Sequence, residues 1–311
     1  MTADRFAIAA RDELWAHGVL LESRLEHGTA VLSDDVIEAT DAYDPDLAAA
    51  CDEEMARLRA AVASVEDARI RAVARAASDG ERSATLTITM RGVSIVTTPA
   101  AAARDTAMLR ALVGREAEEE LCETLPIVWR NGSAAVLLHE AFGHPAEHGI
   151  PLTPALSPRG GERVLEERVR GGPTWLRVED ISPRGTADLL AGHRPHALRR
   201  ASFRDVPLHR MTALVARQVD APFDAPERHV EVHLVAGGTY DPLTDVVTID
   251  VSIANLGGAR LAPFTITTTR DRIAFLGASG EPVRYPGVVC SREGQELVVG
   301  SFAPVMITGA M

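Results

Sequence analysis

The chain has 311 residues, of which 46% are hydrophobic and 24% are charged. This is the balance of an ordinary globular protein, and it excludes a disordered or collagen-like chain. The formal net charge of -12 argues against a nucleic-acid-binding protein, because phosphate binding needs a basic surface.

The length favours two lobes or one large domain. The first residues, MTADRFAIAA, do not combine a basic segment with an apolar run, so we expect no signal peptide. No stretch approaches the roughly 18 consecutive apolar residues of a membrane-spanning helix, so we expect no membrane partner. The three cysteines, Cys51, Cys122 and Cys290, lie far apart in sequence, which favours reduced thiols in a cytoplasmic protein.

The first part of the chain is predicted to be helical and mixed. A composition rich in Ala, Leu, Glu and Arg favours helices over residues 5–27, 45–78 and 100–123. In the second of these segments apolar residues recur at helical intervals, and the pair Asp44-Pro45 is a suitable helix start. Two β-branched runs flank Arg91-Gly92, which predicts a β-hairpin over residues 84–98.

The middle of the chain is predicted to form a short strand and then a buried helix. The strand is expected at Pro126–Trp129, and Asn131, Gly132 and Ser133 offer helix caps before the apolar run AAVLLHEAF. Residues 149–173 are rich in Pro and Gly, which predicts a long loop that is a candidate active-site lid. From about residue 174 the sequence is β-branched, with Gly, Pro and Asp between the runs, which predicts an antiparallel or barrel-like lobe.

These elements predict an α+β fold. We expect a helical and mixed N-terminal region over residues 1–125, followed by a domain over residues 126–311 with a largely antiparallel β lobe. The buried helix of this second domain carries the residues that have the strongest chemical character in the sequence.

A metal-binding pattern, H-E-x-x-x-H, runs from His139 to His144. Zinc peptidase chemistry needs two neutral imidazoles on the metal, a third ligand, an open position for water and a carboxylate that takes the proton of the water. Glu140, directly after the first histidine, is placed to take that proton without binding the metal. The pattern therefore predicts a zinc hydrolase, against the simpler interpretation of a histidine pair in the core.

The spacing of the two histidines predicts a distorted helix. The well-known short form, H-E-x-x-H, places its histidines on one helix face, but five positions on a regular helix turn the second side chain by about 140°. Gly143 permits a distortion, and Pro145 disfavours helical geometry at His144. We therefore predict a π-bulge or a helix end at residues 141–145, which would turn His144 back toward His139.

The string LLHEAFGHPAEHG resembles the metal motif of the TldD/PmbA metallopeptidase family, H-E-A-x-G-H-x-x-E. The positions that match are His139, Glu140, Ala141, Gly143, His144 and Glu147. Further blocks resemble an arginine-rich stretch, a glycine-rich strand pair and a cysteine-bearing turn of that family, and they lie in the family's order at residues 199–212, 236–254 and 289–295. The ordered blocks make the resemblance far more specific than the short motif alone.

The resemblance implies the roles of individual residues. Cys290 is the implied third zinc ligand beside His139 and His144, and two histidines with one cysteine are an accepted catalytic zinc set. Glu140 is the implied general base, which later protonates the leaving amine. Glu147 either orients a ligand histidine or lies exposed at the helix end.

Three arginines of the second block have two interpretations. They either grip a peptide carboxylate or stabilise an oxyanion, or they form surface salt bridges; they are Arg200, Arg204 and Arg210. His148, His193 and His196 match no motif and are interpreted as ordinary histidines.

The leading hypothesis is a zinc metallopeptidase that hydrolyses short or unfolded peptides, with Glu140 as general base. The resemblance implies a dimer, formed either with a second copy or with a related subunit that lacks the motif. The alternative is a non-catalytic, peptide-binding partner subunit in which zinc has a structural role. A different metal hydrolase, such as an amidase, is a third hypothesis, because it would use the same water-activating residues.

Overall fold

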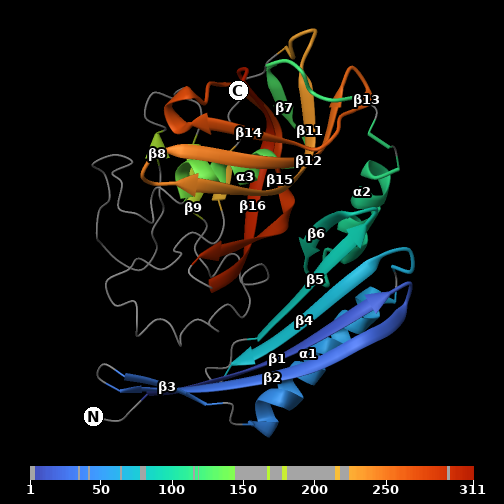
Figure 1. Cartoon of the computed structure of the whole chain (residues 1–311), viewed down its shortest axis with the longest axis vertical. Helices are drawn as coiled ribbons and strands as arrows, with labels where there is room; N and C mark the ends of the chain where they lie inside the picture. The colour runs from blue at the N-terminus through green and yellow to red at the C-terminus, as the bar shows by residue number, and fades with distance from the viewer. Residues whose placement is uncertain are drawn as a thin grey trace. The chain divides into compact units, whose positions relative to one another are not determined.

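The computed structural model describes residues 4–33, 36–40, 43–63, 65–77, 82–114, 116–117, 119–143, 167–168, 177–180, 214–217, 224–292 and 295–311. The chain forms two compact units, each with its own sheet (Figure 1). The first unit contains the described residues up to Ala111 together with Val289–Val298, and the second contains the other described residues. The predicted boundary between residues 125 and 126 remains a prediction.

The first unit is an antiparallel sheet with two helices. Its strands follow one another in the order β6-β5-β4-β1-β2-β3. They are β1 Asp4–Ala16, β2 Val19–Ser33, β3 Val36–Thr40, β4 Arg69–Ala77, β5 Arg82–Met90 and β6 Val93–Thr97. Helix α1 is Pro45–Val62 and helix α2 is Ala102–Leu112.

Helix α1 begins where the sequence predicts. The Asp44 carboxylate accepts hydrogen bonds from the backbone N–H groups of Asp46 and Leu47 at 3.0 and 3.1 Å, and Pro45 fills the first helical position, where no N–H is needed. The apolar side of the helix, which includes Met55 and Leu58, is fully buried. The predicted helix start is confirmed, and burial of the apolar stripe stabilises the helix.

The prediction of helix over residues 5–27 is wrong, because they form the β1–β2 hairpin. His17 and Gly18 both adopt positive φ, 50° and 75°, as a two-residue hairpin turn requires. Weak helix propensity is overridden here by the ladder contacts of β1 with β2 and β4. The helix predicted over 45–78 ends at Val62, and the one over 100–123 is limited to Ala102–Leu112.

The hairpin predicted over residues 84–98 is confirmed. β5 and β6 pair from Met90 and Val93 outward. Between them Arg91 and Gly92 have φ values of 48° and 80°, so both turn residues occupy the left-handed region that a tight hairpin needs.

The second unit is built on a mixed sheet. Its main strand order is β13-β12-β11-β7-β16-β15, with β14 on β12 and β10 between β16 and β9. The strands are β7 Ile127–Trp129, β8 Glu167–Arg168, β9 Arg177–Asp180, β10 Leu214–Arg217, β11 Val230–Asp241, β12 Val246–Leu256, β13 Ala259–Arg260, β14 Phe264–Thr269, β15 Phe275–Arg292 and β16 Gln295–Thr308. The α+β class is confirmed.

Most strand pairs of the C-terminal lobe are antiparallel, as predicted, but two pairs are parallel and make the sheet mixed. β7 runs parallel to β11, with Val230 opposite Ile127, and β10 runs parallel to β16. Parallel neighbours need a long crossover between them. The chain between β7 and β11 contains helix α3, Ala134–Leu138, so the short strand and buried helix predicted from the sequence begin such a crossover.

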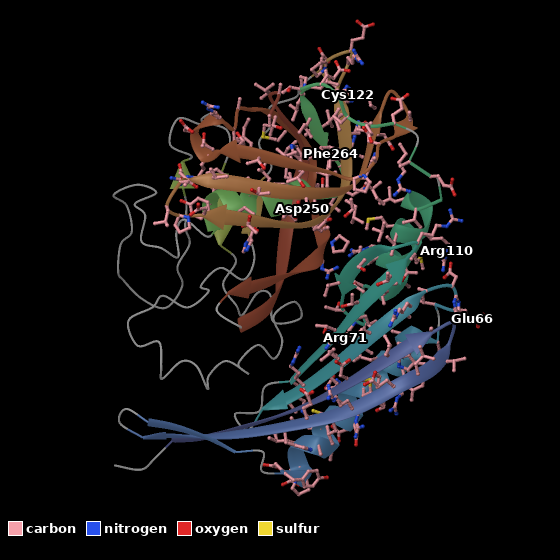
Figure 2. The ribbon with its side chains drawn as sticks, viewed as in Figure 1. Glu66, Arg71, Arg110, Cys122, Asp250 and Phe264 are labelled. Atoms are coloured by element: carbon pink, nitrogen blue, oxygen red, sulfur yellow. The ribbon has the colours of Figure 1, made fainter. Side chains whose placement is uncertain are left out.

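Two cysteines of the described residues are free thiols. Cys51 is buried in α1, and its Sγ donates to the backbone oxygen of Ala9 at 3.1 Å. Cys122 is exposed in the second unit (Figure 2). Burial raises the pKa of the Cys51 thiol, as expected of an inert core cysteine. None of the helices in the described part of the chain is long and apolar enough to cross a membrane.

Candidate functional site

The start of helix α3 is tied to the backbone of β11. The N–H of Arg130 and the hydroxyl of Ser133 both donate to the carbonyl oxygen of Val232, at 2.8 and 3.0 Å. Gly132 adopts φ of 76°, and a Cβ at this position would lie 2.5 Å from the carbonyl oxygen of Val283 on β15. Only glycine fits this close approach, so the helix begins at a position fixed by two strands.

Helix α3 changes into a π-helical turn at the motif. The turn spans His139–Gly143, two residues earlier than the predicted distortion at 141–145, and the prediction of a distorted helix is confirmed. A π-helical hydrogen bond joins positions five residues apart, which is the spacing of the two motif histidines. On a regular α-helix, positions five residues apart point in different directions, whereas on a π-helical turn they lie on nearly the same side.

The two motif residues that have ionisable side chains and are described by the structure, His139 and Glu140, are both buried. The exposed fraction is 1% for His139 and 3% for Glu140. Buried imidazoles and carboxylates are unfavourable unless they have a specific role or partner, and both residues do make interactions in the structure. Beyond them in the turn, the Phe142 ring packs 6.0 Å from that of Phe275, measured between centroids.

Glu140 lies against a glycine of β11. A Cβ added to Gly238 would lie 2.7 Å from Cγ of Glu140, and 3.0 Å from both Cδ1 of Ile249 and the carbonyl oxygen of Thr248. Real Cβ atoms do not approach so closely, so the absence of a side chain at Gly238 is what allows the stem of Glu140 to lie on the sheet. At Gly237, the neighbouring glycine, an added Cβ would meet nothing within 4 Å.

An irregularity in β11 precedes these glycines. The pairing of β11 with β12 shifts register on both sides of Val235. The buried hydroxyl of Tyr285 donates to the carbonyl oxygen of Val235 at 2.8 Å and accepts from its N–H at 2.7 Å. The hydroxyl thus bonds both backbone groups of the residue where the ladder is irregular. Burial raises the pKa of Tyr285, so it remains a neutral donor.

We predict that Tyr285→Phe lowers the free energy of unfolding by about 2 kcal/mol, because it leaves a buried N–H and a buried carbonyl without their hydroxyl partner. Urea unfolding of the full chain measures this. Tyr240→Phe is the matched control, since its hydroxyl donates to Asp245 at 2.8 Å in a part-buried position. Water can replace that partner, so this variant should lose less stability than Tyr285→Phe. Equal losses in the two variants would contradict the role of Tyr285.

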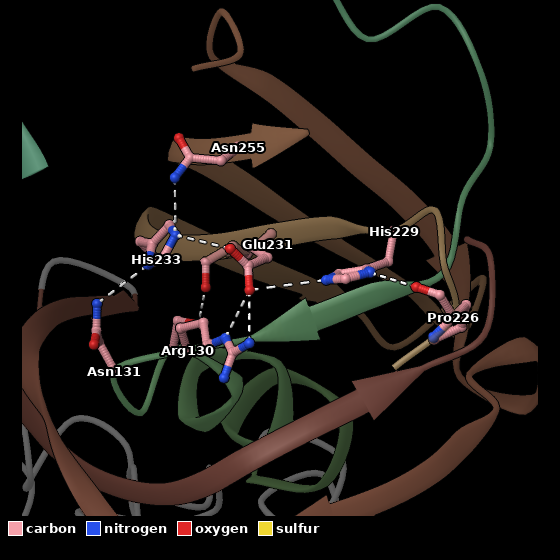
Figure 3. A network of polar contacts seen from close by, with 9 residues as sticks. Arg130, Asn131, Pro226, His229, Glu231, His233 and Asn255 are labelled. Carbon is pink, nitrogen blue, oxygen red and sulfur yellow. Dashed lines mark hydrogen bonds and ion pairs between the residues drawn. The ribbon is translucent and has the colours of Figure 1, made fainter. Parts of the chain in front are cut away.

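A polar network that the sequence did not predict lies at the start of β11 (Figure 3). Arg130 donates to Oε1 of Glu231 from Nε and Nη2 at 3.0 and 2.6 Å. His229 and His233 lie on either side of this carboxylate, with Nε2 to carboxylate oxygen distances of 3.8 and 3.9 Å. The alternation H-x-E-x-H over residues 229–233, which enters β11 at Val230, is the sequence signal that could have found the cluster.

The electrostatics of this network favour a structural role. Burial alone would raise the pKa of Glu231, but its hydrogen bond and charge interaction with Arg130 hold that pKa below the usual value. Burial lowers the pKa of His233, against the opposing effect of Glu231. The guanidinium on the carboxylate neutralises it, and His229 turns Nδ1 to the carbonyl oxygen of Pro226 at 2.7 Å. The cluster is a polar network, centred on the Arg130–Glu231 ion pair, that joins the end of β7 to β11.

The structure describes only some of the residues that are predicted to bind the metal or act beside it. His139 and Glu140 are neighbours on the π-helical turn. Cys290 lies on β15, in the stretch that belongs to the first unit, and its side chain is outside the described part. Also outside it are the predicted residues His144, Glu147, Arg200, Arg204 and Arg210, and the predicted loop at 149–173 apart from Glu167–Arg168.

Within the described ranges, no group of three or more His, Cys, Asp or Glu side chains could hold a metal ion. The side chains of two of the three predicted ligands, His144 and Cys290, are not among those that the structure describes. The ligand set His139, His144 and Cys290 therefore stays a prediction.

The chain is similar to several solved structures over nearly its full length. One is a proposed modulator of a DNA gyrase from Thermotoga maritima, with 12% identity, coverage of 98% of this chain and 94% of the other, and a TM-score of 0.48. A second is TldE from Thermococcus kodakarensis, with 10% identity, coverage of 99% and 96%, and a TM-score of 0.44. A third, at 10% identity and a TM-score of 0.34, with coverage of 98% and 93%, is a proposed modulator of DNA gyrase from Bacteroides thetaiotaomicron.

These matches are to structures of the TldD/PmbA family. No protein-family model matches the sequence, and a comparison with curated proteins finds no match. At such identities and TM-scores, the roles of residues in this chain have to come from its own sequence and geometry.

Proposed function

We propose that this chain is a zinc-dependent metallopeptidase that hydrolyses short or unfolded peptides. The observation that carries the proposal is the π-helical turn that presents buried His139 and Glu140, with Glu140 lying on Gly238. A core histidine would need neither the change of helix type nor the glycine beneath the carboxylate. The four ordered sequence blocks that resemble the TldD/PmbA metallopeptidases support the same reaction.

The donor set fits zinc. His139, His144 and Cys290 would hold the ion, since imidazole nitrogen and thiolate sulfur are the ligands that Zn²⁺ prefers. The π-helical turn fits the five-residue separation of the histidines. When bound, zinc would lower the pKa of a coordinated water and polarise the peptide carbonyl.

The role of the protein in the reaction centres on Glu140. Its carboxylate accepts the proton of the attacking water and returns it to the leaving amine nitrogen. Packing of its stem against Gly238 limits the positions that this carboxylate can take, so it is already oriented before substrate binds. Arg200, Arg204 and Arg210 are proposed to hold the peptide carboxylate or the oxyanion, and Glu147 is proposed to orient a ligand histidine.

Residues 126–311 form the metallopeptidase domain, and residues 1–125 form the N-terminal region. An extended peptide would bind as an added strand on a sheet edge, which selects against folded substrates. The enzyme would work as a dimer, either with a second copy or with a related subunit.

Metal content tests the proposal. We expect about one zinc per chain in the purified wild type, and substantial loss in His139→Ala and Cys290→Ala, because a three-ligand site that loses one ligand binds zinc poorly. Elemental analysis of the folded proteins measures this. Cys122→Ala is the matched control, because Cys122 is an exposed thiol, and it should keep its zinc.

Each outcome has a definite meaning. A folded wild type that takes up no zinc, even when zinc is supplied, would refute the peptidase. Zinc retained by Cys290→Ala would refute the third ligand alone. A zinc bound by four protein ligands would support the non-catalytic partner subunit, since a structural site is closed and a catalytic site keeps an open position.

A further inference from the structure

Among the residues that the structure describes, strand β2 of the first unit has one edge without a strand partner over part of its length. On one side it pairs with β1 over most of its length. On the other side β3 pairs only with Thr29–Ser33, so no strand of the described ranges pairs with the outer side of Glu22–Gly28. The register of β1 with β2 shifts at Leu21, which has no partner on β1. The regular open stretch therefore runs from residue 22 to residue 28, and its centre is Leu25.

This stretch carries charges of alternating sign. Glu22, Arg24 and Glu26 share one face of the strand. The side chains of Arg24 and Glu26 are 68% and 64% exposed, and their closest N–O distance is 3.5 Å. An exposed pair at this distance contributes little to stability, so both side chains can take new partners.

The alternation makes the edge complementary to itself. Natural sheets protect open edges with charges such as lysines, because unpaired N–H and C=O groups otherwise recruit another chain. Charges of one sign repel a second copy, but an antiparallel copy centred on Leu25 would place each Arg24 opposite a Glu26. A copy centred on Arg24 would place like charges opposite each other, and one centred on Ser23 would extend into the irregularity at Leu21.

We propose that two copies of this chain associate through their β2 edges, antiparallel, about a two-fold axis at Leu25. Leu25 then faces Leu25 of the second copy, and the two Arg24–Glu26 pairs are equivalent, as a two-fold interface requires. Backbone groups of residues 22–28 gain ladder partners across the axis. This inference rests on the proposed dimer, for which it specifies a second copy and a surface.

One pair of edge strands is a small interface. Interfaces at the low end of the size range are weak and transient, so we expect a reversible dimer whose population rises with protein concentration. Zinc plays no part in this contact, and neither does the peptidase reaction.

A charge reversal tests the register. Arg24→Glu turns both cross-axis attractions into repulsions, and we expect it to raise the dimer dissociation constant by about tenfold. The double variant Arg24→Glu with Glu26→Arg exchanges the two charges and should restore the wild-type constant. Sedimentation velocity of the full chain over a range of concentrations measures all three. The matched control is Arg110→Glu in α2, the same charge change at an exposed residue that pairs with Asp67 at 2.7 Å (Figure 2).

The expected pattern is weakening by Arg24→Glu, recovery in the double variant and a wild-type constant in Arg110→Glu. A monomeric wild type at every concentration would overturn the proposal, as would an Arg24→Glu variant that dimerises normally. Failure of the double variant to recover would exclude the axis at Leu25. Because zinc content and peptide hydrolysis are measured separately, this inference and the proposed peptidase can fail independently.

Discussion

Glu140→Gln is expected to lower the rate of peptide hydrolysis by about a thousandfold while zinc content stays at the wild-type value, since general acid–base catalysis contributes about 10²–10⁴. The amide has nearly the size of the carboxylate, so its packing on Gly238 is preserved. It cannot accept the proton of the attacking water. The measurement is kcat/KM on a pool of fluorogenic peptides, with zinc determined on the same samples.

The control for this variant is Glu227→Gln, which neutralises an exposed carboxylate in the same unit and should leave kcat/KM unchanged. Full activity of Glu140→Gln would remove the general base from the mechanism, and with it the main support for a peptidase. Loss of zinc from Glu140→Gln would instead mean that the carboxylate holds the site together. The general-base role requires that activity and metal content separate in this one variant.

The parts of the site that the sequence predicted are those with local causes. The distortion of the helix could be predicted from the five-residue spacing between His139 and His144, and from Gly143 and Pro145, which weaken a regular helix at this point. All of these residues lie within a few positions of one another. The β5–β6 hairpin follows equally locally, from Arg91-Gly92 between two β-branched runs. In such cases neighbouring residues leave the chain few alternatives, and no long-range contact has to be known.

The parts that the sequence did not predict depend on contacts between distant residues. The β1–β2 hairpin has a composition that favours helix, and its strands form because β1 pairs both with β2 and with β4, which follows α1 in the sequence. The contact of Glu140 with Gly238 joins positions about a hundred residues apart, and the glycine gives no sign of its partner. The hydroxyl of Tyr285 on the backbone of Val235 is of the same kind.

The contact between Glu140 and Gly238 leads to the second large expected effect. Gly238→Ala should lower kcat for peptide hydrolysis by about a hundredfold, because displacement of a catalytic group by about 1 Å can cost this much. The new methyl would lie 2.7 Å from Cγ of Glu140, and the backbone oxygen of Thr248 at 3.0 Å prevents it from moving away toward β12. Relief therefore has to come from Glu140, whose Cγ is close to the backbone and not at the free end of the side chain.

Gly237→Ala is the matched control, since the same methyl group there meets nothing within 4 Å. Both variants remove a strand glycine, so a general effect of alanine on β11 would appear in both. Steady-state kinetics should show a loss of kcat with little change in KM for Gly238→Ala only, with zinc retained and an overpacking cost of about 1–3 kcal/mol in urea unfolding. Equal activity in the two variants would show that Glu140 does not act from its position against Gly238 of β11, because its side chain cannot keep that position once the methyl is present.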